Sequence, residues 1–149
     1  TEGYAQIKFK SISLEEAKTL ARAEDKLIFI DFWATWCKPC IEMEKETFSN
    51  TKVGAAINAN YIPLKLDVDY FENMDIKEDY NVSIMPTILI INPDGEVQNR
   101  LMGKKSPESL MTELNLPYYE DTVVDVGTKK DKSEKKECFL KRWWNTITN

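Results

Sequence analysis

The spacing of apolar positions along the chain predicts an alternation of strands and helices. Strands are indicated by alternation or by short continuous apolar runs, and helices by apolar residues three and four positions apart. The predicted strands cover residues 6–12, 27–33, 61–68, 86–91 and 96–102. The predicted helices cover residues 14–23, 41–48, 52–58, 71–80 and 107–114. This order predicts an α/β domain whose central mixed sheet is flanked by helices and closed by an antiparallel hairpin.

Local signals mark the ends of several predicted elements. Ser13 is followed three residues later by Glu16, and this pair is a capping box that starts the first helix. The residues Asn92–Gly95 are typical of a turn between the last two strands. The last helix completes the domain, so we predict a globular domain over residues 1–116 and a C-terminal extension over residues 117–149.

Composition excludes several function classes. The chain has 149 residues, enough for one domain with a real core, and its net charge of −5 argues against a nucleic-acid partner. It contains no histidine, which excludes Ser-His and Cys-His nucleophiles and histidine-ligated metals. Three cysteines without histidine do not close a zinc site within one chain, so no metal is predicted. No apolar stretch is long enough for a transmembrane helix.

Cys37 and Cys40 are the residues on which the predicted chemistry depends. They follow the apolar run 27–33 and open the next helix, a context in which the C-x-x-C spacing indicates a redox pair. A helix N-terminus favours a thiolate, and Lys38 adds a positive charge beside it. We therefore expect Cys37 to attack a disulfide and Cys40 to resolve it. Packing cysteines, or half of a metal site, are the alternatives.

Asp31 interrupts the apolar run with a carboxylate. A buried carboxylate is costly unless it has a partner or a role, and burial would raise its pKa. Asp31 is therefore a candidate proton acceptor for Cys40, unless it lies solvated at a strand edge. Lys65, in another apolar strand, is a candidate partner, with an outward-facing strand residue as the alternative. Glu42, Glu44 and Glu46 are interpreted as the solvent-exposed face of the helix that follows Cys40, with tuning of the dithiol by Glu44 or Glu42 as the alternative.

Pro86 precedes the strand-forming residues 87–91. A proline cannot donate to a sheet ladder, so it belongs at the start of a strand. If the Met85–Pro86 peptide bond is cis, the backbone of Met85 is free to pair with an extended substrate.

These features lie in segments that resemble thioredoxin, namely DFWATWCKPC, PLKLDVD, IMPTILII and the later Gly103. The resemblance covers residues 6–116 and implies a thioredoxin fold. It implies that Cys37 is the nucleophile, Cys40 the resolving cysteine and Asp31 the buried acid. It also implies that the substrate is bound by residues around the dithiol, which are Trp36, Met85, Pro86 and Gly103.

The chain departs from the thioredoxin pattern at two places. Lys38 and Pro39 stand where thioredoxin has Gly-Pro, and Lys45 stands where it has a helix-kinking proline. The segment from residue 40 to 53 is more similar to the C-terminal domain of the membrane thiol:disulfide interchange reductase and to other extracytoplasmic relatives. We therefore expect Lys38, Pro39 and Lys65 to tune the dithiol. The expected location is extracytoplasmic (periplasmic), with a cytoplasmic location as the alternative.

The function predicted from these residues is reversible thiol–disulfide exchange on protein substrates. The expected cofactor is none beyond the Cys37–Cys40 disulfide itself, and another redox protein would regenerate the dithiol. The lack of histidine and the proline before Cys40 favour the reducing direction. A redox-inactive binding module with a structural disulfide is the main alternative, and metal delivery through the cysteine pair is another.

The predicted extension differs in character from the domain. A charged run at residues 129–137 is followed by an aromatic segment in which Phe139, Trp143 and Ile147 follow helical spacing. This apolar stripe fits packing on the domain or on a second copy, contact with a membrane surface, or the end of a longer protein. Cys138 is unpaired by count, and we interpret it as a free thiol rather than as a crosslink.

Overall fold

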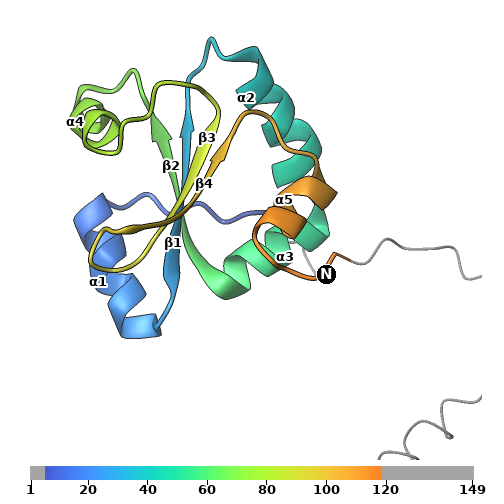
Figure 1. The fold of residues 1–149 in the computed structure, drawn as a ribbon, viewed down its shortest axis with the longest axis horizontal. Coiled ribbons are helices and arrows are strands. Elements are labelled where there is room, and N and C mark those ends of the chain that lie inside the picture. The colour runs from blue at the N-terminus through green and yellow to red at the C-terminus, as the bar shows by residue number, and fades with distance from the viewer. Residues whose placement is uncertain (1–5, 119–149) are drawn as a thin grey trace, which may run out of the picture. The chain divides into compact units, whose positions relative to one another are not determined.

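Residues 6–118 are described by the structure, a computed structural model. Four strands form one sheet in the order β2-β1-β3-β4 (Figure 1). β1 pairs with β2 in parallel and with β3 antiparallel, and β3 pairs antiparallel with β4. The predicted mixed sheet with its closing hairpin is therefore confirmed. The strands are β1 (Leu27–Trp33), β2 (Tyr61–Asp67), β3 (Thr87–Ile91) and β4 (Val97–Met102).

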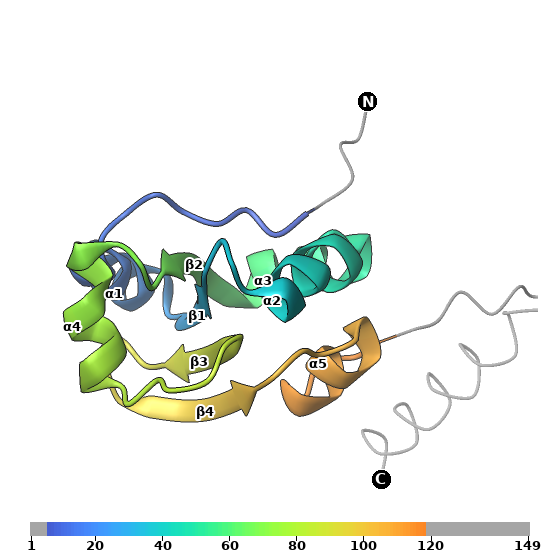
Figure 2. The same cartoon turned by 90° about the horizontal axis from the view of Figure 1, so that it is seen from above.

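Helices cover both faces of this sheet. α1 and α4 lie on one side of the sheet in Figure 2, and α2, α3 and α5 lie on the other side. The helix that follows Cys37 is α-helical in α2 and continues as a π-helix, η1, where the sequence predicts a single α-helix. The helices are α1 (Leu14–Glu24), α2 (Lys38–Met43), η1 (Glu44–Phe48), α3 (Thr51–Asn60), α4 (Phe71–Asp79) and α5 (Pro107–Glu113).

β1 is the central strand, buried on both faces as its apolar run predicts. Because side chains alternate along a strand, its residues divide between two cores. Ile28, Ile30 and Phe32 pack in one core with residues of α1 and β2. Phe29 packs in the other core with residues of η1, α3 and α5. Asp31 alternates with Ile30 and Phe32, so it points to the same side of the sheet as Phe29.

The strand predicted over residues 6–12 is wrong. These residues form neither strand nor helix, although the Lys10 N–H donates to the carbonyl of Pro63 over 2.9 Å. Pro63 has no N–H of its own, so it interrupts any regular ladder along this edge of β2. The side chain of Asn58 holds the segment instead, by accepting from the Lys8 N–H and donating to the carbonyl of Gln6.

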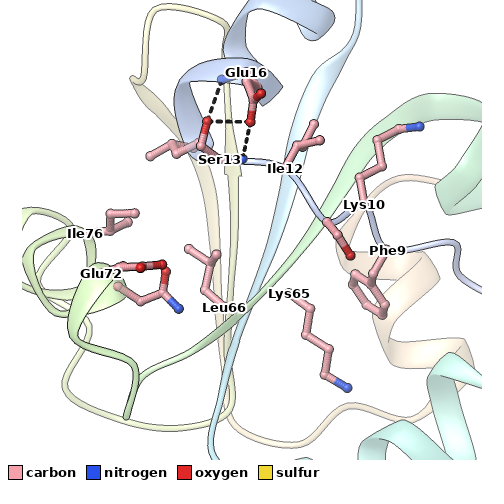
Figure 3. Close-up of a pocket in the computed structure, with 12 residues that line it drawn as sticks. Phe9, Lys10, Ile12, Ser13, Glu16, Lys65, Leu66, Glu72 and Ile76 are labelled. Atoms are coloured by element: carbon pink, nitrogen blue, oxygen red, sulfur yellow. Dashed lines mark hydrogen bonds between the residues drawn. The ribbon is translucent and has the colours of Figure 1, made fainter.

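The capping box at the start of α1 is confirmed. The Glu16 N–H donates to Ser13 Oγ over 3.2 Å, and the Ser13 N–H donates to Glu16 Oε2 over 2.8 Å (Figure 3). The predictions for Cys138 and for the aromatic stripe lie outside the described residues. Within the range 6–118, none of the helices has the length and apolar character that crossing a membrane requires.

Candidate functional site

Cys37 and Cys40 lie at the start of α2, shortly after the end of β1. β1 ends at Trp33, and the chain turns through residues 34–36 to Cys37, the extended N-cap residue of α2. Cys37 and Cys40 form a disulfide, with their Cα atoms 5.3 Å apart. The Cys40 N–H also points at Cys37 Sγ over 3.3 Å. The sulfur of Cys37 therefore lies where a backbone donor and the start of a helix both favour negative charge.

Asp31 lies within β1, the strand that leads into this disulfide. It is 2 % exposed, and β1 is an interior strand, so the solvated edge position is excluded. Its Oδ1 atom is buried without any hydrogen-bond partner among the described residues. Burial raises the pKa of this carboxyl to about 7; the charge of Lys65 opposes that rise, and the charge of Glu44 adds to it. A carboxyl with this pKa can release or accept a proton near neutral pH.

Lys65 is the neighbour of Asp31 in the sheet register, but its ammonium group has a different partner. Lys65 Nζ forms an ion pair with Glu44, and it lies 4.4 Å from the centroid of the Trp33 ring. Lys65 is therefore not the direct hydrogen-bond partner of Asp31 and acts on it through its charge. Glu44 is likewise not a purely solvated residue. Its spacing of four from Cys40, which puts both on one helix face, is the signal that could have located it.

Pro86 and Gly103 are brought together from two strands. The Met85–Pro86 peptide bond is cis, and the carbonyl of Pro86 accepts from the Gly103 N–H over 2.9 Å. Gly103 has a φ of +81°, a left-handed conformation that favours glycine. A Cβ atom there would meet nothing within 4 Å, so backbone conformation rather than space selects glycine.

Trp36 is exposed, with 66 % of its surface accessible to solvent. Its indole Nε1–H donates to Asp69 Oδ2 over 2.8 Å. This hydrogen bond ties the loop before Cys37 to the turn after β2.

A second connection, missed by sequence reasoning, joins the helix of Cys40 to the loop after β4. Lys104 Nζ forms ion pairs with Glu42 over 3.0 Å and with Glu46 over 2.7 Å. The buried hydroxyl of Thr47 donates to the carbonyl of Lys105 over 2.6 Å. Gly103 immediately precedes these two lysines, so the contacts hold the loop that is hydrogen-bonded to Pro86 next to the helix that contains Cys40.

The groove drawn in Figure 3 is a different feature from this site. It has a volume of about 550 Å³ and lies between residues 9–14, β2 and α4. Lys65 and Leu66 line it from β2, and neither cysteine does. Within residues 6–118, no cluster of three or more Cys, Asp or Glu side chains is arranged to hold a metal ion.

Comparisons with known proteins agree with this geometry. The profile of the thioredoxin-like domain matches residues 14–116. Thioredoxin-1 of Drosophila melanogaster is 42% identical over 86 residues, which cover 58% of this chain and 71% of that protein. Thiol:disulfide interchange protein DsbD of Salmonella typhimurium is 32% identical over 97 residues, which cover 63% of this chain and 17% of DsbD. The solution structure of a candidate disulphide-isomerase from Bacteroides thetaiotaomicron aligns with a TM-score of 0.65 and 33% identity, over 78% of this chain and 99% of that one.

The fold and the paired cysteines define a thiol–disulfide oxidoreductase of the thioredoxin type. The chain belongs to the thioredoxin-like family, whose members use no cofactor other than the cysteine pair. The chain spans about a sixth of DsbD, so nothing about the rest of that protein carries over.

The raised pKa of Asp31 predicts how stability depends on pH. Below pH 3.8 the carboxyl is protonated in both states; between pH 3.8 and about 7 only the unfolded chain releases the proton. Asp31 therefore makes the free energy of unfolding fall as pH rises through this range, by about 4 kcal/mol in all. We expect Asp31→Asn to lose most of this fall. Urea unfolding of the oxidised protein at pH 4 to 8 measures it, and parallel curves for the two proteins would contradict the prediction.

Proposed function

We propose that this chain reduces protein disulfides with the dithiol of Cys37 and Cys40. The observation that carries the proposal is the carboxyl of Asp31, buried and lacking a partner at Oδ1, in the strand that leads into a disulfide at the start of a helix. Such a group destabilises the fold, so its presence there is best explained by a role in proton transfer.

The exchange proceeds in two balanced steps. The Cys37 thiolate attacks one sulfur of the substrate disulfide, a new S–S bond forms, and the other substrate sulfur leaves as a thiolate that takes up a proton. The Cys40 thiol then loses its proton, attacks Cys37 Sγ and closes the Cys37–Cys40 disulfide, which releases the second substrate sulfur. The substrate gains two electrons, and the dithiol loses them.

Asp31 acts in the second step of this scheme. A thiol attacks only as the thiolate, so the proton of Cys40 needs an acceptor inside the protein. A carboxyl whose pKa is about 7 is suited to accept it at neutral pH. Lys65 and Glu44 set that value through their opposing charges, and Lys38 and Pro39 tune the dithiol from between the cysteines.

The substrate backbone lies along the Pro86 side of the dithiol. The hydrogen bond from the Gly103 N–H to the Pro86 carbonyl fixes the backbone at this edge. An extended substrate segment can pair with the backbone of Met85, and the exposed ring of Trp36, next to Cys37 in the chain, is available to contact it.

The proposed setting is extracytoplasmic, where a second redox protein returns the Cys37–Cys40 disulfide to the dithiol by the same exchange. The similarity to DsbD, a periplasmic thiol:disulfide interchange protein, supports this setting. Thioredoxins are also among the relatives, so a cytoplasmic protein with the same chemistry is the alternative. Contact of the extension with a membrane surface stays a prediction.

Cysteine variants test the proposed roles. We expect the reduced protein to reduce insulin disulfides with dithiothreitol as donor, and Cys37→Ser to lose this activity because no attacking thiolate remains. Cys40→Ser should accumulate the mixed disulfide with the substrate, which non-reducing electrophoresis detects. Cys138→Ser is the matched control and should keep the activity. An inactive unsubstituted protein would instead favour a binding module whose disulfide is structural.

The redox potential tests the proposed direction. Thioredoxin-fold proteins range from about −270 mV for reductants to about −120 mV for oxidants. We expect equilibration with glutathione to place the Cys37–Cys40 pair near the reducing end. A potential near the oxidising end would contradict the proposed direction and leave thiol–disulfide exchange itself intact.

A further inference from the structure

An apolar surface begins at the N-terminal end of α4. Tyr70 is 65 % exposed, Phe71 is 84 % exposed and Met74 is 45 % exposed. No residue of α4 is buried. α4 contributes Glu72, Asn73 and Ile76 to the neighbouring groove (Figure 3), so the two aromatic side chains are not among the groove's lining. Aromatic side chains left in water at this density indicate an interaction site.

This surface is continuous with the redox site. Trp36, next to Cys37, donates to Asp69, and Tyr70 and Phe71 directly follow Asp69 in the chain. The turn that carries them is held in place because the Asn73 side chain donates to the carbonyl of Asp67 over 2.8 Å. The aromatic pair is therefore presented on an ordered turn, next to the segment that any substrate of Cys37 approaches.

The same surface is strongly negative. Residues 67–79 contain six carboxylates and a single basic residue, Lys77. No ion pair neutralises Glu72, Asp75 or Glu78 within residues 6–118. By contrast, Glu42 of α2 and Glu46 of η1 are neutralised by ion pairs with Lys104.

We propose that the surface formed by Tyr70, Phe71, Met74, Glu72 and Asp75 binds protein substrates whose disulfide is flanked by a segment rich in both apolar and cationic side chains. This inference rests on the proposed reductase function and names its substrate class. The aromatic rings bury the apolar side chains of the substrate, and the carboxylates pair with its cations. Two copies of this face would repel one another, and so would the face and an anionic membrane, which favours a basic protein partner.

The test uses three synthetic peptides that share one disulfide loop and differ in the flanking segment. The first segment alternates Lys with Leu and Phe, the second alternates Glu with Leu and Phe, and the third alternates Lys with Ser. The reduced full-length protein is mixed with each peptide, and quenched thiol labelling gives the second-order rate constant. We expect the Lys/Leu/Phe peptide to react about tenfold faster than either of the others.

Two double variants and two matched controls assign this preference to the surface. In Tyr70→Ser/Phe71→Ser, the Lys/Leu/Phe peptide should react no faster than the Lys/Ser peptide. In Glu72→Gln/Asp75→Asn, it should react no faster than the Glu/Leu/Phe peptide. The controls are Val97→Ser, which removes an exposed apolar side chain of β4, and Glu108→Gln/Glu113→Gln, which removes two charges from α5; both should keep the full preference.

A small uncharged disulfide, bis(2-hydroxyethyl) disulfide, distinguishes this substrate preference from the reductase function on which it rests. All variants should reduce it at the rate of the unsubstituted protein, because it is too small to reach the α4 surface. Equal rates with the three peptides, together with normal reduction of the small disulfide, would overturn the substrate preference alone. Failure to reduce any of the disulfides would overturn the reductase function, and the inference with it.

Discussion

The burial of β1 between β2 and β3 is the constraint on which the rest of the molecule depends. Because both edges of β1 are paired and both faces are covered, its side chains must be apolar or must cost stability. A reactive group can therefore be placed only at the end of the strand, or within it as a buried polar side chain that lowers stability. The chain uses both: the disulfide follows the end of β1, and Asp31 lies within it.

The cost of burying Asp31 and its usefulness have the same physical origin. Low-dielectric surroundings disfavour the charged carboxylate, which lowers stability above neutral pH and also brings its pKa into the range where proton transfer is possible. Lys65 and Glu44 moderate this balance, since one charge lowers the pKa and the other raises it. Their mutual ion pair means that the electrostatics of the site extend from the sheet to η1.

Much of this arrangement could be predicted because it follows from local patterns. The apolar run of β1, the capping box at Ser13 and the C-x-x-C spacing can each be recognised from a few consecutive residues. The prediction of a strand at residues 6–12 is wrong because this segment lies beside Pro63, some fifty positions away in the sequence, which has no N–H to donate. The Lys65–Glu44 ion pair and the Thr47–Lys105 hydrogen bond also join distant segments. Local spacing can mark Glu44 as a candidate, but it does not indicate which distant side chain each of these residues contacts.

We conclude that a buried carboxyl in β1, the strand that leads into the Cys37–Cys40 disulfide, changes its protonation state near neutral pH. The most direct test is a carbon-13 NMR titration of the side-chain carboxyl of Asp31 in the oxidised protein, with the resonance assigned by its absence in Asp31→Asn. We expect the titration of the Asp31 carboxyl to have its midpoint near pH 7. A midpoint near 3.8, the ordinary value for an aspartate, would contradict it.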